Sequence, residues 1–251
     1  MSILSHIDDA HVGHIQISRA ERKNALTARM YDAMVTILRE YDADDNVRVI
    51  LLYGLPEMFC AGNDLSDFLE NPINDANSPV IQFLYTLRDL QKPLVMCVNG
   101  VAVGIGATML LHADFVVAAE DSKFQLPFIN LALCPEGGSS LLLPQRAGYL
   151  RAAEKLMFGE FFSTKDAFDM QMVTHILPHH ETLRYAVHQA HRLAEKSPSA
   201  MRETKRLLKT ANANALHQCL DAEISSFAQL LKGNDAREAM TAFLEKRKPN
   251  F

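Results

Sequence analysis

The pattern of apolar and polar positions predicts a chain of alternating strands and helices. Five short segments have either strict alternation or a continuous apolar run, as strands do: residues 2–7, 11–18, 47–52, 94–98 and 115–119. Between them, two stretches place apolar residues on one helical face: a helix capped by Thr27 and running to about Tyr41, and a second at 80–90. This repeated order predicts parallel strands joined by crossover helices.

The pattern changes after Pro178, where helical periodicity continues without a convincing strand. Four helical segments are expected there: residues 181–196, 199–210, 213–231 and 235–246. An α/β core followed by a helical C-terminal region is therefore the expected architecture. The stretch 70–79 is rich in Asn, Asp and Pro and has no periodicity, which predicts a surface loop.

One stretch, residues 98–114, combines a strand end, three glycines and a predicted helix, and none of residues 100–111 is charged. Gly100, Gly104 and Gly106 interrupt the chain, and apolar residues at helical spacing continue to His112. Backbone N–H groups at such a helix start lack intrahelical partners, so they can stabilise negative charge. The alternative is that the glycines only allow close packing of helix and sheet. Their spacing is not that of a dinucleotide-binding fingerprint.

Composition narrows the class of protein. The net charge of −5 gives no basic surface for nucleic acid or an anionic membrane. The four cysteines are widely spaced and form no CxxC pair, which favours free thiols over disulfides. No signal peptide or membrane-spanning run is evident, so a cytoplasmic location is expected.

Several short motifs occur together in one order, although each alone is weak. They are RKNAL (22–26), FCAGNDL (59–65), GVAVGIG (100–106), FQLPF (124–128), PEGG (135–138) and the closing FLEKRKPNF (243–251). In this combination the chain resembles the crotonase family of enoyl-CoA hydratases and isomerases over nearly its whole length. The resemblance implies an α/β crotonase-like fold: a ββα spiral core (1–195) and a helical oligomerisation region (196–251). It also implies an acyl-CoA ligand, and a homotrimer or a hexamer built from two trimers.

The resemblance further implies where coenzyme A binds. Lys23 and Ala25 correspond to the loop that lines pantetheine and phosphate, and AGNDL resembles the adenine and thioester loop. The members of that second loop are Ala61, Gly62, Asn63, Asp64 and Leu65. The backbone of Ala61 would meet the adenine, whereas Asp64 is better interpreted as fixing the loop than as an acid.

An oxyanion hole is the second implication of the resemblance. Its donors would be the N–H of Asn63 and the N–H of Ile105, which lies between Gly104 and Gly106. The helix dipole would assist the Ile105 N–H. Removing a proton next to a thioester carbonyl makes an enolate, whose charge falls on the oxygen. Loss of one such donor typically costs about 10²–10³ in rate.

Two departures from the family pattern change the expected reaction. Family hydratases carry two glutamates that activate water, and here Thr108 and Phe128 occupy the corresponding positions. Both residues are still expected to line the substrate site. Without the two carboxylates, addition of water by the usual route is not expected, because phenylalanine cannot transfer a proton and an unassisted threonine is a poor base.

Glu136 is the acid that remains in this neighbourhood. The string PEGGSS resembles the segment that carries the catalytic base in Δ3,Δ2-enoyl-CoA isomerases of the peroxisomal type. Its apolar sequence context would raise its pKa if the carboxyl is buried. The alternative is a helix cap or a solvent-facing side chain. With Glu136 as the base, the expected activity is isomerisation of 3-enoyl-CoA to trans-2-enoyl-CoA, which needs no metal or redox cofactor.

Other activities remain open. The fold could support hydration or hydrolysis with an unusual acid, or the chain could bind acyl-CoA without catalysis. Cys134 is better interpreted as a buried thiol than as a nucleophile, and His179 with His180 is weak evidence for a metal. Lys246 and Lys248 could reach a CoA phosphate or belong to a solvated tail.

Overall fold

The main sheet has six strands in the order β1-β2-β3-β4-β6-β9 in the computed structural model, which describes residues 2–70 and 77–251. Its strands are β1 (Ile3–Ile7), β2 (Val12–Ile17), β3 (Val49–Tyr53), β4 (Leu94–Val98), β6 (Phe115–Ala119) and β9 (His175–Leu177). Only the β1–β2 pair is antiparallel among these; every other neighbouring pair is parallel. The predicted parallel sheet is thus confirmed. Most of the predicted loop at 70–79 lies outside the described residues.

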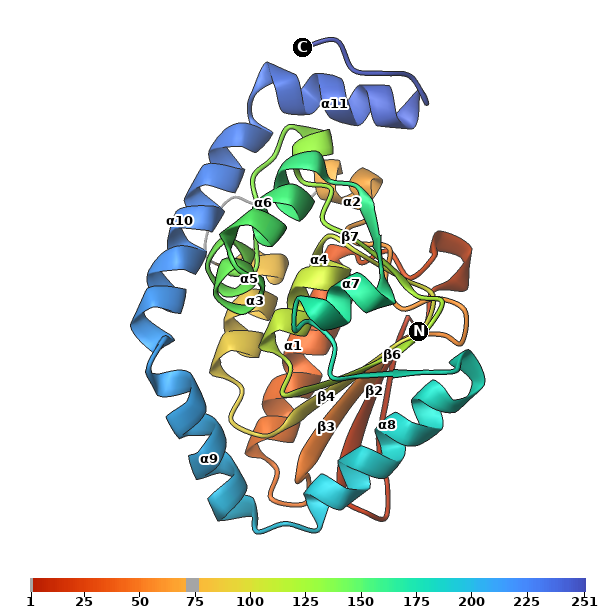
Figure 1. Ribbon diagram of the computed structural model, residues 1–251, viewed down its shortest axis with the longest axis vertical. Helices are drawn as coiled ribbons and strands as arrows, with labels where there is room; N and C mark the ends of the chain where they lie inside the picture. Colours follow the sequence, from red (N-terminus) through yellow and green to blue (C-terminus); the bar gives the residue numbers. More distant parts are fainter. Residues whose placement is uncertain (1, 71–76) are drawn as a thin grey trace.

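The continuous apolar runs arise because the central strands are covered on both faces. On β3, Ile50 and Leu52 face the larger core cluster, while Val49 and Leu51 face a second cluster built with α8 (His179–Ala194). Alternate residues therefore enter two different cores. Figure 1 shows α8 on one side of the sheet, with α1 (Ala28–Ala43) and α3 (Pro79–Asp89) on the other.

A second, smaller sheet lies beside the first. It consists of β5 (Val101–Val103), β7 (Lys123–Gln125) and β8 (Phe161–Ser163), with β5 and β7 parallel. The expected helix after the glycines is shorter than predicted, because β5 comes first. Only α4 (Ile105–Thr108) is α-helical, and a 3₁₀ turn, η2 (Met109–His112), completes the segment. So short a helix has little dipole, which weakens that part of the prediction.

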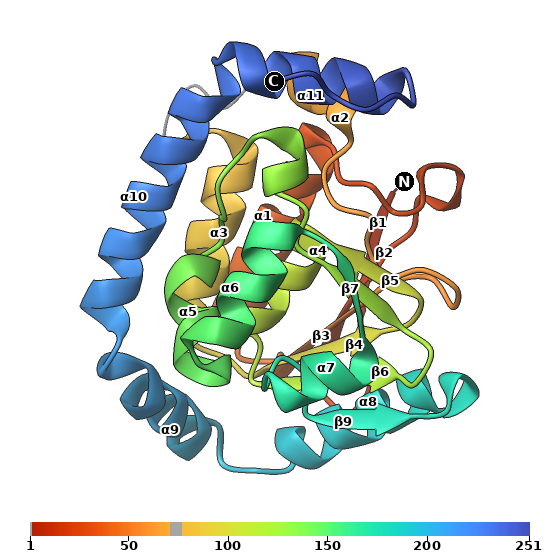
Figure 2. The ribbon, with the colours of Figure 1, turned by 45° about the horizontal axis from the view of Figure 1, so that its top comes forward.

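The remaining helices include three after residue 197 that agree with the predicted segments to within a few residues. The remaining helices are α2 (Leu65–Glu70), α5 (Ser139–Ala147), α6 (Tyr149–Phe158), α7 (Thr164–Asp169), α9 (Pro198–Thr210), α10 (Ala213–Leu231) and α11 (Asn234–Leu244), with 3₁₀ turns η1 (Ala20–Arg22) and η3 (Ile129–Leu131). In Figures 1 and 2, α9 and α10 form one edge of the molecule and α11 crosses one end. Among the described helices, none has the length and hydropathy needed to cross a membrane.

Candidate active site

Two segments far apart in sequence lie side by side because two glycines permit it. Cys60 pairs with β5 through two hydrogen bonds of 3.0 Å, from its N–H to the Val101 carbonyl and from the Val103 N–H to its own carbonyl. A Cβ on Gly62 would lie 3.0 Å from the Val103 oxygen, and one on Gly106 would lie 2.7 Å from the Cys60 oxygen. Close packing therefore requires glycine at Gly62 and Gly106. The packing interpretation of the sequence holds for Gly106 but not for Gly104, where an added Cβ would meet no atom within 4 Å.

This packing brings the Asn63 loop to the start of α4. Leu26 donates its N–H to Gly62 (2.8 Å) and accepts that of Asp64 (2.9 Å), so the intervening Asn63 N–H points away from Leu26. Ile105 is the first residue of α4, where an N–H has no intrahelical acceptor. Neither amide donates to another described residue. Two such donors can stabilise an oxygen that becomes negatively charged.

Glu136 is buried, with 8% of its surface exposed. The Thr108 hydroxyl donates a hydrogen bond of 2.5 Å to its Oε1. Burial raises the pKa of Glu136 to about 8; the Thr108 hydrogen bond opposes that rise, and the Glu223 carboxylate adds to it. The interpretation of Glu136 as solvent-facing is therefore wrong. A carboxyl with this pKa exists in both protonation states near neutral pH, so it can take and return a proton.

The loop that carries Glu136 is fixed by its neighbours on two sides. The Ser139 hydroxyl donates to the Glu136 carbonyl (2.6 Å), and His112 Nε2 donates to the Gly137 carbonyl (2.7 Å). Burial lowers the pKa of His112 to about 4, so the ring is neutral and can act as an N–H donor at neutral pH. Gly137 and Gly138 have φ of +69° and +74°, which favours glycine at both positions. Glu136 lies before α5 begins, and its turn is therefore held by one local bond from Ser139 and one tertiary bond from His112.

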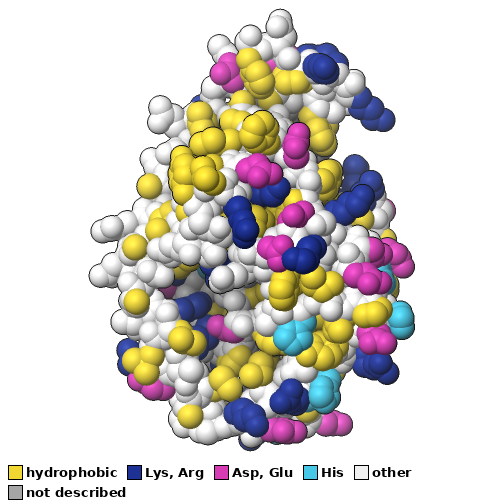
Figure 3. All heavy atoms as spheres, viewed as in Figure 1, with side chains coloured by type: hydrophobic (Ala, Val, Ile, Leu, Met, Phe, Trp, Pro, Cys, Tyr) yellow, Lys and Arg dark blue, Asp and Glu magenta, His cyan; other side chains and the backbone are white. Residues whose placement is uncertain are grey.

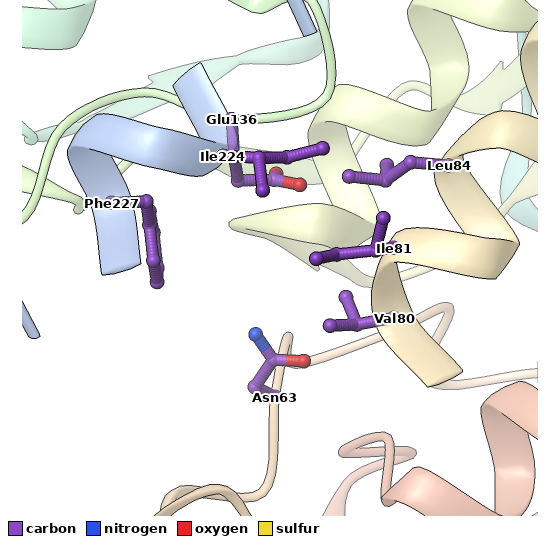
Figure 4. A pocket seen from close by; sticks show the side chains of 7 residues that line it. All are labelled: Asn63, Val80, Ile81, Leu84, Glu136, Ile224 and Phe227. Atoms are coloured by element: carbon purple, nitrogen blue, oxygen red, sulfur yellow. The ribbon is translucent and has the colours of Figure 1, made fainter. Parts of the chain in front are cut away.

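Glu136 and Asn63 line one small cavity, shown in Figure 4. Its other walls are apolar: Val80, Ile81 and Leu84 from α3, and Ile224 and Phe227 from α10. The cavity volume of about 20 Å³ is enough for about one water molecule. A bound acyl group would therefore require side chains of α3 or α10 to move aside.

The predicted CoA-binding residues form a pair of loops bound to each other. The Ala61 N–H donates to the Lys23 carbonyl (3.2 Å), and Arg19 Nη1 donates to the Ala25 carbonyl (2.8 Å). Between them, the fully buried Asn24 side chain donates to the carbonyls of Ile17, Met58 and Phe59 at 2.9–3.1 Å. The backbone of both loops is thus set before any ligand binds.

Asp64 accepts a hydrogen bond of 2.8 Å from Arg19 Nη1. Burial favours a higher pKa for Asp64, but the bonds from Arg19 and from the N–H of Asp67 lower it overall. It also accepts from the Ser66 N–H in the first turn of α2, the helix that Leu65 begins. These contacts agree with a residue that fixes the loop and stays ionised.

Phe128 is 7% exposed and belongs to the main hydrophobic core, outside the set of residues that line the cavity.

Several residues that build the site were not identified from the sequence. They are Tyr31, Val80, Ile81, Leu84, His112, Glu223, Ile224 and Phe227. Tyr31 donates to Asn63 Oδ1 at 2.5 Å. A usable signal existed for Glu223 alone, since it is a carboxylate in the apolar stripe of α10.

Comparison with known proteins identifies the class. The family model described as enoyl-CoA hydratase/isomerase matches residues 8–251, and the chain belongs to this family. It is 33% identical to 1,2-epoxyphenylacetyl-CoA isomerase of Escherichia coli strain K12, over 99% of this chain and 97% of that protein. It is 30% identical to enoyl-CoA delta isomerase 2 of Rattus norvegicus, over 94% of this chain and 62% of that protein.

A solved structure agrees with this assignment. The crystal structure of an enoyl-CoA hydratase/isomerase from Pseudoalteromonas atlantica T6c superimposes with a TM-score of 0.94 at 33% identity, covering 100% of both chains. The crotonase-type α/β fold with a C-terminal helical region is thereby confirmed. The rat isomerase is less similar to the chain than the Escherichia coli isomerase, so a special likeness to Δ3,Δ2-enoyl-CoA isomerases stays a prediction.

Proposed function

We propose that this protein isomerises a 3-enoyl-CoA to trans-2-enoyl-CoA. Glu136 is the acid/base, and the amides of Asn63 and Ile105 form the oxyanion hole. The observation that carries this proposal is the buried Glu136 carboxyl, which faces the same cavity as Asn63 and has a pKa of about 8.

The reaction follows from one carboxylate and two amides. Ionised Glu136 removes a proton from C2 of the thioester, and the electrons move onto the thioester oxygen to give a dienolate. The N–H groups of Asn63 and Ile105 stabilise that oxygen, and the carboxyl then returns the proton to C4. Proton and electrons balance within the substrate, because the double bond moves from C3–C4 to C2–C3.

Hydration is less well supported, because the cavity holds a single ionisable side chain. Of the described residues that line it, only Glu136 can transfer a proton, and the others are Asn63 and five apolar residues. Thr108 directs its hydroxyl to Glu136 and so supports that carboxyl rather than replacing a second one. Coenzyme A is expected along the loops of Lys23, Ala25 and Ala61.

A second candidate is the isomerisation of an aryl epoxide thioester. The similarity to 1,2-epoxyphenylacetyl-CoA isomerase extends along almost the whole of both chains and supports it. This reaction also starts from a CoA thioester and redistributes bonds within one molecule. The same acid and the same two amides would serve both substrates.

Purified protein should convert 3-hexenoyl-CoA to the conjugated thioester, followed by its ultraviolet absorbance. Glu136→Gln should lower kcat by about 10²–10⁴-fold while preserving the dissociation constant for the substrate, because amide and carboxyl have similar size. Glu120→Gln, which removes an exposed carboxylate, is the matched control.

Parallel assays separate the alternatives. Turnover of 1,2-epoxyphenylacetyl-CoA alone would favour the second candidate, and hydration of crotonyl-CoA alone would contradict both isomerase candidates. Tight binding without turnover of any substrate would indicate an acyl-CoA-binding protein that does not catalyse. Full activity of Glu136→Gln on 3-hexenoyl-CoA would refute the assigned acid/base.

We also propose a homotrimer or a pair of trimers. Helix α6 exposes a stripe of large apolar side chains, with Leu150 82% and Phe158 65% exposed. Phe161, which follows in β8, is 56% exposed. Figure 3 shows hydrophobic side chains gathered over α6 and the adjoining part of α11. An apolar surface of this kind is typical of a contact with another chain.

A further inference from the structure

Helix α10 carries one carboxylate in its buried stripe. The buried residues of α10 are four, three and four positions apart, so they lie on one face of the helix. They are Leu216, Leu220, Glu223 and Phe227, all 8% exposed or less. A buried charge is costly unless polar partners replace water. Glu223 forms no salt bridge with a described residue, so its partners must be hydrogen-bond donors.

Those donors belong to the turn that follows Glu136. Glu223 Oε2 accepts the Gly138 N–H at 2.6 Å, and Oε1 accepts the Ser140 N–H at 2.8 Å and its hydroxyl at 2.5 Å. These three hydrogen bonds replace the water that the carboxylate loses on burial. They also place it at the start of α5, where the helix dipole favours negative charge.

The same turn of α10 faces the substrate cavity. Ile224 follows Glu223 directly. Phe227 lies four residues after Glu223, on the same face of the helix as Glu223. Figure 4 shows Ile224 beside Glu136 and Phe227 further along α10, and all three line the same cavity. One helical segment thus contacts the acyl cavity and the backbone that holds the acid.

We propose that Glu223 is a positioning residue, which fixes the Glu136 turn to α10 and keeps a second negative charge close to the acid/base. The inference rests on the proposed function of Glu136. It assigns Glu223 no contact with substrate.

The other titratable groups around Glu136 do not supply this charge. Burial raises the pKa of Cys134 to about 11 and raises that of Tyr31, so both are neutral at neutral pH. Burial lowers the pKa of His112 to about 4, which leaves that ring neutral as well. Glu223 is then the charged neighbour that favours the protonated form of Glu136.

The test compares pH profiles of kcat/KM for three variants. Glu223→Gln removes the charge, and the acidic limb set by Glu136 should move to lower pH by about one pH unit. Glu223→Asp keeps the charge but withdraws it from Gly138 and Ser140, so kcat should fall about tenfold with the limb unmoved. Asp221→Asn removes an exposed carboxylate from the same helix and should change neither.

A second measurement does not depend on turnover. The carboxyl ¹³C resonance of Glu136, assigned by its loss in Glu136→Gln, should titrate at lower pH in Glu223→Gln than in the parent protein. If no enoyl-CoA is turned over, the proposed function fails, but this titration still tests Glu223. A rate loss in Glu223→Gln without movement of the limb or the resonance would overturn the proposal. If Glu223→Gln does not fold, unchanged kcat in Glu223→Asp would overturn it.

Discussion

The Thr108 hydroxyl donates a hydrogen bond to the Glu136 carboxylate across 28 positions of sequence. Both side chains are buried, and the bond favours the ionised form of an acid whose burial favours the protonated form. The pKa of about 8 is the result of these opposing effects. Thr108 therefore adjusts the acid rather than acting as one.

Thr108→Val should move the acidic limb of the kcat/KM profile to higher pH by about one to two units. The variant removes a hydrogen bond to a charged group, worth about 1.5–3 kcal/mol, from the ionised form of Glu136. Activity at pH 7 falls in consequence, because less Glu136 is ionised. Thr108→Ser keeps the hydroxyl and should retain the parent profile. A limb that stays in place in Thr108→Val would contradict this account.

Gly106→Ala should lower kcat by about 10²–10³-fold, the typical effect of losing one oxyanion donor. The new Cβ would lie 2.7 Å from the Cys60 carbonyl, so the Asn63 loop and α4 must separate. Gly233→Ala, at a glycine of ordinary φ remote from these segments, is the control. Steady-state kinetics on 3-hexenoyl-CoA check the result, and equal rates for the two variants would refute it.

Tyr31→Phe should reduce kcat by about tenfold. The Tyr31 hydroxyl donates to the side-chain oxygen Oδ1 of Asn63. Removing the hydroxyl leaves that oxygen without this donor, at a cost of about 1–3 kcal/mol. Tyr41→Phe is a matched control on the same helix, because Tyr41 is also buried and donates to the distant His14 carbonyl at 3.4 Å. If both variants lose activity equally, the effect comes from α1 packing and not from Asn63.

Asp8→Asn should destabilise the protein at neutral pH but less so in acid. Burial favours a higher pKa for Asp8, but hydrogen bonds from His14, Val12 and His191 lower it far below the usual value. An acid whose folded pKa is depressed stabilises the fold above its unfolded pKa of about 4 and loses that contribution as pH falls. The urea midpoints of variant and parent should therefore converge below about pH 4.

The exposed neighbour Asp9 provides the control for that experiment, because Asp9→Asn removes a carboxylate from the same turn without these partners. Its midpoint should follow the parent at each pH. A constant difference between Asp8→Asn and the parent would show that the carboxylate charge is not the cause.

Leu150→Lys combined with Phe158→Lys should reduce the oligomer to smaller species in sedimentation velocity. Each substitution places a charge in a surface that association would bury. Glu154→Lys adds the same charge to the same helix at an exposed polar position and should leave the assembly unchanged. Parent protein that sediments as a monomer would contradict the proposed trimer.

Local rules account for most of the elements. Continuous apolar runs predicted β3, β4 and β6, because each alternates between two cores, and Thr27 predicted the start of α1 through its side-chain bond to the Met30 N–H. Motif order identified the family before any contact was known. The sequence could not show β5, since three residues between glycines carry no distinguishing period.

The sequence by itself determined the uncharged glycine segment, and its resemblance to the crotonase family predicted that Thr108 and Phe128 stand in place of two acids. It also identified Glu136 as the remaining carboxyl. Only the tertiary structure decided that this carboxyl is buried, accepts from Thr108 and faces Asn63. It alone joined Glu223 to the same turn. The physical reason is that pKa and donor geometry depend on desolvation and on partners distant in sequence, which local periodicity does not encode.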